Sequence, residues 1–287
     1  MRYARVVRLG LLSLSLIAGP VLADTVFYNN DFPDGKMATA SGTIMVGGVA
    51  HETESADDFS LAHLSRITGG SFTGLVPLGA DTSAISSVGL EIYRVFPADS
   101  ILPETGSPGI PTRKNSPADV DIGAAARDSS SGNLTFTLNP LNENVSVSNS
   151  VVDGIVLNEG GNLAKDGREV RIDFTVDPKA PLELAAGDYF FVPQVTLKDG
   201  SSFLWLSADR PIGAFGATQL ATDRQTWIRN ETIANNWLRV GTDIIGAGNQ
   251  YNAAFRLVGT VVPEPTGIVM LIAGLIAVGA WSQRKRA

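Results

Sequence analysis

Cysteine is absent from this chain of 287 residues, and histidine occurs only twice. The absence of cysteine excludes disulfide bonds, thiol redox chemistry and thiolate metal sites. His51 and His63 stand twelve residues apart in a segment rich in carboxylates. A zinc site needs three or four converging ligands, and this spacing does not ensure convergence. Stability must come from a hydrophobic core, and the chain is long enough to bury a substantial one.

Basic residues are scarce between the two ends of the chain. Without the three basic residues at each end and without Glu264, 16 basic and 28 acidic residues remain, a net charge of about −12. Such a surface repels the phosphates of nucleic acids and the headgroups of anionic lipids. We therefore expect no nucleic-acid partner, whereas neutral polysaccharides and divalent cations are compatible with this charge.

Helical periodicity is also missing, because apolar residues alternate with polar ones in short runs. The clearest run is 169–176, in which Val170, Ile172, Phe174 and Val176 share one face of a strand. Comparable runs occur at residues 88–92, 134–138, 182–184, 189–197, 203–207 and 253–261. Glycine-containing turn signals separate many of them. The pattern predicts an all-β body, an antiparallel, jelly-roll-like β-sandwich over residues 24–261.

Three local features of this body can be predicted. Lys198-Asp199-Gly200-Ser201 has the composition of a tight hairpin turn between the runs 189–197 and 203–207. Pro193 cannot donate to a ladder, which predicts an edge strand or a bulge. Residues 97–132 contain five prolines and are expected to form a long surface loop with a short strand near 120–122. A boundary between two small domains is the alternative for this segment.

Catalytic signatures are missing as well. The sequence has no Gly-x-Ser-x-Gly turn, the setting of a serine nucleophile in one large class of hydrolases. Nothing in it selects two carboxylates that face each other across a cleft, as glycoside hydrolysis requires. We therefore expect no catalysis, with a glycan-active hydrolase as the third hypothesis after two non-catalytic ones.

Residues 1–23 have the three parts of a secretory signal peptide. Three arginines within the first eight residues precede the apolar residues 9–17, and Val21-Leu22-Ala23 predicts cleavage after Ala23. An uncleaved N-terminal anchor is the alternative. The signal predicts that the secretion translocon exports the rest of the chain.

Charge is absent from residues 267–281, which predict a C-terminal transmembrane helix. Fifteen residues are few for a hydrocarbon core about 30 Å thick, which takes roughly 17–25 residues to cross. Val262-Pro263-Glu264-Pro265 precedes the run and Arg284-Lys285-Arg286 follows it. The positive-inside rule keeps the basic tail in the cytoplasm and places the body outside. A plain single-pass anchor is one interpretation of this arrangement.

The Pro-Glu-Pro element, the short apolar helix and the basic tail, in this order, resemble the PEP-CTERM sorting signal of Gram-negative bacteria. The resemblance covers residues 262–287. It implies transient anchoring in the inner membrane with the body in the periplasm, and processing by an exosortase. Transfer to the cell surface or the extracellular matrix would follow. The resemblance implies no activity for the body, which we expect to be a structural or adhesive component.

Trp227 and Trp237 are the candidate carbohydrate-binding residues, in a polar segment that also contains Arg229 and Asn235. Exposed aromatic faces beside polar side chains can stack on sugar rings. This predicts a lectin-like module for exopolysaccharide as the alternative to a purely structural protein. Packing of both tryptophans at one end of the sandwich is the other interpretation.

Asp57 and Asp58 are the candidate calcium ligands, since Ca²⁺ prefers hard oxygen donors. Residues 55–61, together with 67–72, resemble a stretch common in jelly-roll domains of exported bacterial proteins. In such a domain the two aspartates would stand at a strand entry, and a solvated turn is the alternative to calcium. No other cofactor is expected. The core residues predicted in this stretch are Phe59, Leu61, Ile67 and Phe72.

Overall fold

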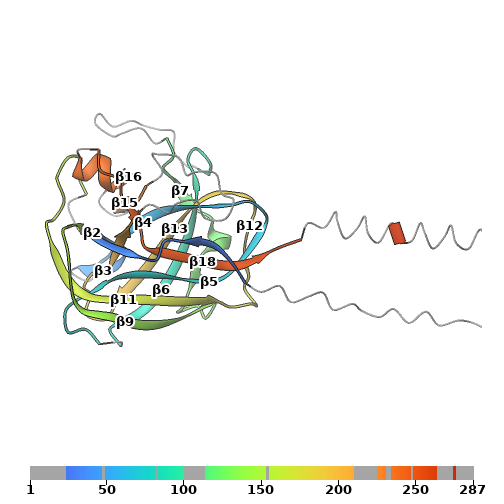
Figure 1. Ribbon diagram of the computed structural model, residues 1–287, viewed down its shortest axis with the longest axis horizontal. Coiled ribbons are helices and arrows are strands. Elements are labelled where there is room, and N and C mark those ends of the chain that lie inside the picture. The colour runs from blue at the N-terminus through green and yellow to red at the C-terminus, as the bar shows by residue number, and fades with distance from the viewer. Residues whose placement is uncertain are drawn as a thin grey trace, which may run out of the picture.

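The computed structural model describes residues 24–46, 49–81, 83–99, 114–152, 155–209, 225–230, 234–246, 248–263 and 274–275. Within them two sheets contain almost all regular structure (Figure 1). The first sheet has the order β1-β18-β5-β14-β2-β10, with β9, β11, β12 and β17 attached. Its strands are β1 (Thr25–Asn29), β2 (Pro33–Ala40), β5 (Ser65–Val76), β9 (Leu134–Val147), β10 (Asn149–Val151), β11 (Lys165–Val176), β12 (Leu182–Leu184), β14 (Leu204–Ala208), β17 (Asn252–Ala253) and β18 (Phe255–Val261).

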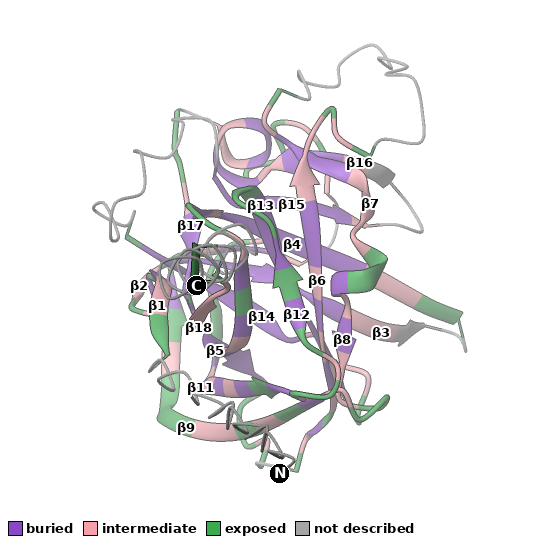
Figure 2. Cartoon of the chain, turned by 90° about the vertical axis from the view of Figure 1, so that its right-hand side faces the viewer, coloured by how far each residue is buried: buried purple, intermediate pink, exposed green. Residues whose placement is uncertain are grey.

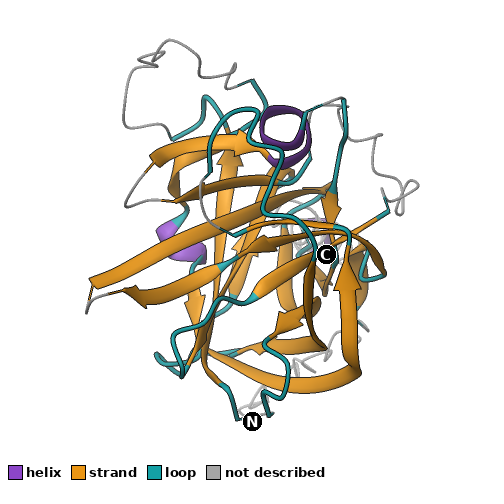
Figure 3. Cartoon of the chain, turned by 90° about the vertical axis from the view of Figure 1, so that its left-hand side faces the viewer, coloured by secondary structure: helices purple, strands orange, loops and turns teal. Residues whose placement is uncertain are grey.

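The second sheet has the order β16-β15-β4-β13-β6-β7, with β3 paired to β4 and β8 paired to β6. Its strands are β3 (Gly42–Val46), β4 (Val49–Leu61), β6 (Ile85–Val95), β7 (Pro117–Asp121), β8 (Arg127–Asp128), β13 (Gly187–Leu197), β15 (Trp227–Asn230) and β16 (Ala234–Arg239). Short helices appear at η1 (Gly123–Ala125) and η2 (Val240–Ile245) (Figure 3). The described strands pair antiparallel except β10 with β2. The predicted all-β class is confirmed.

Phe191 of β13 shows how the two sheets meet. Its ring stacks on Phe255 of β18 with centroids 5.1 Å apart, and on Phe174 of β11 at 6.0 Å. Trp205 of β14 meets it edge-on at 5.9 Å. All four side chains are buried, and Figure 2 shows buried residues following β4, β5 and β6. The apolar faces of the two sheets therefore enclose one core in a sandwich-like arrangement.

Alternating runs in the sequence correspond to strands with one buried face. In β11, Val170, Ile172, Phe174 and Val176 are buried, as predicted. The residues between them are more exposed, as a period of two requires. The predicted core residues of β4 and β5 are also buried: Phe59, Leu61, Ile67 and Phe72.

The Asp-Gly turn at residues 198–201 does not join hairpin partners. β13 belongs to the second sheet and β14 to the first, so the turn carries the chain from one sheet to the other. Only Thr196 and Ser202 form an isolated bridge across it. The hairpin prediction is wrong here because Phe203, just after the turn, is buried in the core between the sheets.

Pro193 lies in an internal strand of the second sheet. The ladder between β13 and β4 ends at the pair Phe191–Asp57, whereas Pro193 pairs only with Leu90 of β6. On its open side, the carbonyl of Pro193 accepts a hydrogen bond from Ser41 Oγ at 2.5 Å. The missing N–H therefore falls where the strand has a local edge.

The proline-rich segment, residues 97–132, contributes a strand to the second sheet. Its described part contains β7, at Pro117–Asp121, close to the short strand predicted near 120–122. Residues 100–113 lie outside the described residues. β4 and β6 precede the segment and β13 and β15 follow it, and all four belong to the same sheet.

Most of the predicted terminal signals lie outside the described residues. These include residues 1–23 with Ala23, and Glu264, Pro265 and the basic tail Arg284, Lys285 and Arg286. Of the predicted helix at 267–281, only residues 274–275 are described, and they are helical. No helix among the described residues is long and apolar enough to span a membrane. Val262, which directly follows β18, donates its N–H to the carbonyl of Leu64 at 2.8 Å.

Candidate functional site

The outer face of the second sheet, the face turned away from the core, carries most of the candidate residues. Val88, Leu90 and Ile92 of β6 face the core, so Glu91 and Tyr93 face outward. The other strands contribute outward residues by the same alternation. A second, smaller apolar cluster lies on this face: Ala56, Tyr93, Phe190, Val192, Trp227 and Trp237.

Trp227 and Trp237 belong to this outer cluster and are only 1% and 3% exposed. The guanidinium carbon of Arg229 lies 4.6 Å from the Trp237 ring centroid, and that of Arg239 lies 5.0 Å from the Trp227 ring. Trp237 Nε1 donates to the carbonyl of Ala118 at 3.1 Å. Neither ring has the exposed face that sugar stacking requires, so the packing interpretation describes both.

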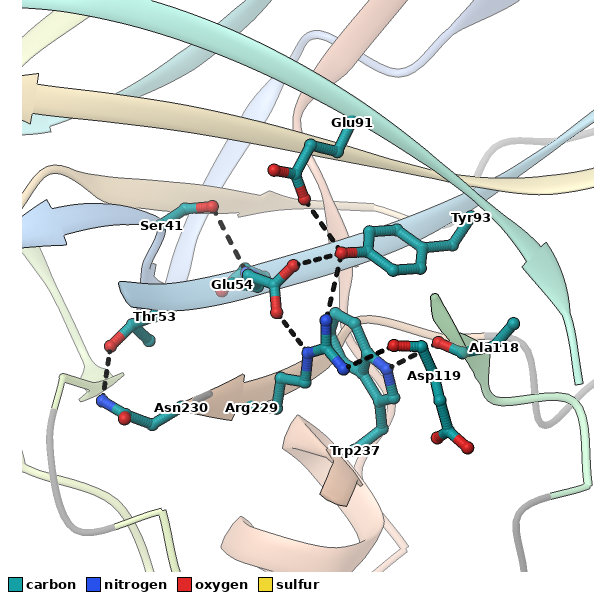
Figure 4. Close-up of polar contacts among 11 residues, drawn as sticks. Ser41, Thr53, Glu54, Glu91, Tyr93, Ala118, Asp119, Arg229, Asn230 and Trp237 are labelled. Carbon is teal, nitrogen blue, oxygen red and sulfur yellow. Dashed lines mark hydrogen bonds and ion pairs between the residues drawn. The ribbon is translucent and has the colours of Figure 1, made fainter. Parts of the chain in front are cut away.

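Arg229 is buried in an ion pair with Glu54. The two residues are direct partners in the β15–β4 ladder, and Arg229 Nε donates to Glu54 Oε2 (Figure 4). Arg229 Nη1 donates to the carbonyl of Asp119 at 3.2 Å. The side chains are 4% and 1% exposed. Arg229 therefore binds inside the protein, and the side chain of Asn235 lies outside the described residues.

The phenol of Tyr93 connects this ion pair to a second carboxyl group. Its Oη lies 2.5 Å from Glu54 Oε1, 2.9 Å from Glu91 Oε2 and 3.0 Å from Arg229 Nη2 (Figure 4). A phenol has one proton, so Tyr93 can donate to only one of the two carboxyls. Burial, followed by the charges of Glu54 and Glu91, raises the pKa of Tyr93, which keeps that proton in place.

Of the two carboxyl groups beside Tyr93, Glu91 is the one that keeps its proton at neutral pH. Arg229 pairs with Glu54, whereas Glu91 forms no ion pair among the described residues. Burial, then the charge of Glu54, its hydrogen bond and the charge of Glu52, raise the pKa of Glu91 to about 9. Glu91 is therefore an uncharged carboxylic acid at neutral pH, because an ionised form would meet a second carboxylate in a buried site.

A pocket of about 260 Å³ opens beside Glu91 on the same face. Strands β3, β4, β6 and β13 supply side chains that can donate or accept hydrogen bonds. The main polar side chains are Thr43, Glu52, Ser87, Glu91, Gln194 and Thr196. The pocket is small for a ligand site, for which about 300–1,000 Å³ is usual, and it suits one sugar-sized group.

Gln194 is the least satisfied side chain of this pocket. It is 9% exposed, and neither its amide oxygen nor its amide nitrogen has a hydrogen-bond partner within the described structure. Gly89 stands opposite it on β6 and has no side chain to fill the space. A buried amide without partners is costly, so a ligand with both donors and acceptors would remove that cost.

Arg127 also lines the pocket, but its guanidinium group is hydrogen-bonded to backbone carbonyls. Its Nε donates to the carbonyl of Ala180 at 2.9 Å, and its Nη1 to those of Ala124 at 3.0 Å and Ala126 at 2.6 Å. Burial lowers the pKa of this group. Two carboxyl groups, those of Glu52 and Asp128, line the pocket beside it.

The candidate calcium ligands Asp57 and Asp58 point to opposite faces of β4. They lie inside β4 and are 0% and 1% exposed, so neither the strand entry nor the solvated turn predicted for them is seen. Successive strand residues point to opposite faces, and Asp57 Oδ2 accepts from the N–H of Ala253 at 2.6 Å. Among the described residues, no group of three or more histidines and carboxylates could hold a metal ion.

Three pocket residues were not predicted from sequence: Glu52, Glu91 and Gln194. They come from three strands that only sheet pairing brings together. Glu91 follows the outward positions Ser87 and Gly89 in the alternating run, which is a signal for exposure and not for a site. Comparison with known proteins adds no guide, because no family model, curated protein or solved structure matches the chain.

Proposed function

We propose that this chain is an exported, non-catalytic adhesion protein of the cell surface or extracellular matrix, and that its body binds exopolysaccharide. The observation that carries the proposal is the polar pocket of about 260 Å³ on the outer face of the second sheet. Sugars present many hydroxyl groups in a small volume, and this pocket offers hydroxyl, carboxyl and amide groups at that scale. We therefore propose the residues of this pocket, and not Trp227 and Trp237, as the binding residues.

The proposed architecture is a jelly-roll-like β-sandwich followed by a C-terminal transmembrane helix. Jelly-roll domains occur among lectins, which supports a binding role without assigning one. The predicted signal peptide and the PEP-CTERM resemblance support export, transient anchoring in the inner membrane and processing by an exosortase. Since β18 ends at Val261, the body would lie close to the membrane before processing.

Affinity gel electrophoresis of the full chain in gels containing matrix polysaccharide tests this function. We expect slower migration in at least one such gel, and unchanged migration in a gel of linear polyacrylamide alone. Migration that no matrix polysaccharide slows would contradict the binding function. Loss of the protein from the surface after deletion of residues 262–287 is the corresponding expectation for sorting.

A glycan-active hydrolase is the second candidate, because Glu52 and Glu91 line the same pocket and the pKa of Glu91 is raised. Glycoside hydrolases combine an acid of raised pKa with a second carboxylate. We rank it lower because Glu91 Oε2 lies against the phenol of Tyr93 inside the protein. Release of new reducing ends from a bound polysaccharide would reverse this ranking.

A further inference from the structure

We propose that the pocket selects uncharged saccharide units, and that Glu91 takes part as a neutral carboxylic acid, held in that state by its burial beside Glu54. The inference rests on the proposed polysaccharide binding and names the class of sugar bound. The chain contributes two features to this selectivity, an uncharged acid at the edge of a buried network and a buried amide that needs partners.

Glu91 lies between the buried network and the pocket. Its Oε2 lies 2.9 Å from Tyr93 Oη, so this oxygen contacts the buried network. The same side chain lines the pocket. A neutral carboxyl oxygen accepts a hydrogen bond from a sugar hydroxyl without placing a further negative charge in the site.

Gln194 lines the same pocket. Its amide has two donors and one acceptor group, all without partners among the described residues. A sugar hydroxyl donates and accepts, so it can satisfy both ends of the amide when the side chain turns these enclosed atoms toward the pocket. An ammonium group can only donate, so that group cannot satisfy the amide nitrogen.

The charges around Glu91 come from several strands. Glu52 and Glu54 face it from β4, Tyr93 from its own strand, and Arg229 approaches through Tyr93 from β15. β13 faces it with the apolar Val192, the cross-strand partner of Glu91. β8 adds Asp128 and Arg127, of which the arginine is bound to backbone carbonyls. An acidic sugar would bring its carboxylate toward Glu52 and Asp128, and Arg127, the cation among the described lining residues, is already bound to backbone carbonyls.

The network also predicts how binding depends on pH. Ionisation of Glu91 would add a negative charge beside Glu54 in a buried site. Since the pKa of Glu91 is about 9, the neutral pocket exists at neutral pH and is lost in alkali. Saccharide binding should therefore weaken as the pH rises through that value.

The test is affinity gel electrophoresis of the full chain with dextran, mannan and galactan as neutral probes and polygalacturonate as the acidic probe. We expect retardation by at least one neutral probe and none by the acidic probe. E91L removes the polar group and should weaken binding by about tenfold, the scale of one lost hydrogen bond to a buried partner. E91Q is isosteric with the neutral acid, so it should bind as the wild type does at about pH 7 and lose the weakening at about pH 10.

E143Q provides the matched control, because Glu143 is exposed on β9 and its side chain does not line the pocket. Thermal unfolding of each variant verifies that it is folded. Stronger retardation by polygalacturonate than by every neutral probe overturns the inference, as does equal binding by E91L and wild type. In both cases polysaccharide binding itself stands. No retardation of the wild type by any polysaccharide overturns the proposed function, and the inference with it.

Discussion

Arg229 donates its Nε proton to Glu54 directly across the β15–β4 ladder, and both side chains are almost fully enclosed. The pair is stable in this setting because Tyr93 and the carbonyl of Asp119 satisfy further atoms of the two groups. This ion pair also affects Glu91, which lines the pocket. By fixing the charge of Glu54, the pair leaves the neighbouring Glu91 as the carboxyl that holds a proton.

Removal of one partner of this pair should destabilise the fold strongly. Arg229→Met leaves Glu54 buried without its cation, and the expected loss is about 3–5 kcal/mol of unfolding free energy. The double variant Glu54→Leu/Arg229→Met should lose much less than the sum of the two single changes, because no charge is left buried. Urea unfolding measures all three. A single-variant loss below about 1 kcal/mol would contradict the enclosed ion pair.

Glu91 should make stability fall as the pH rises. Its pKa is 4.5 in an unfolded chain and about 9 in the fold, so between these values the unfolded state releases a proton that the folded state keeps. The contribution is therefore complete below the lower value and is lost as pH rises toward the higher one. The slope from this group is at most about 1.4 kcal/mol per pH unit.

The variant Glu91→Gln isolates this effect, because the amide does not titrate. Its stability relative to the wild type should improve steadily from about pH 5 to about pH 9 and then remain constant. Urea unfolding at several pH values provides the comparison. Parallel curves for the two proteins would mean that Glu91 is already ionised in the fold.

Trp237 should matter for stability and not for sugar stacking. Trp237→Ala removes a large buried ring under Arg229 and should cost about 3–5 kcal/mol. Trp237→Phe keeps most of the ring but loses the hydrogen bond from Nε1 to Ala118, for which about 1–2 kcal/mol is expected. Chemical unfolding gives both values. A folded Trp237→Phe protein that no longer binds polysaccharide would instead favour a direct role for the tryptophan.

The two tryptophans show where sequence reasoning stops. The fold class follows from local alternation, as in Val170, Ile172 and Phe174, because a half-buried strand has a period of two. The buried position of Trp237 includes a hydrogen bond from its Nε1 to the carbonyl of Ala118 in β7, which lies 119 residues earlier. No local pattern contains that relationship. The same limit applies to the turn before Phe203, because a turn sequence does not specify which sheet receives the next strand.

The pocket is harder to predict from the sequence than the burial of the tryptophans. Gln194 and Glu91 are distant in the chain and meet because β13 pairs with β6. A glycine such as Gly89 inside a strand usually only weakens that strand. Only the pairing register shows that Gly89 lies opposite Gln194. The protonation of Glu91 depends on four side chains from three strands, so composition and spacing could not reveal it.

Processing at the C-terminus has its own measurable outcome. If an exosortase acts at the Pro-Glu-Pro element, the protein isolated from the cell surface should lack the residues after the cleavage point. Intact-mass spectrometry of the surface form should give a mass well below that of a chain ending at Ala287. A surface form that still ends at Ala287 would favour the single-pass anchor.

Replacement of Gln194 tests the central claim, that the pocket is the saccharide site, most directly. Gln194→Leu keeps the size of the side chain and removes only the amide, whose atoms have no partner inside the described structure. Gln250→Leu is the matched control at an exposed position that does not line the pocket. We predict that Gln194→Leu unfolds no more easily than the wild type and that neutral polysaccharide retards it about tenfold less. Retardation equal to that of Gln250→Leu and the wild type would contradict the account.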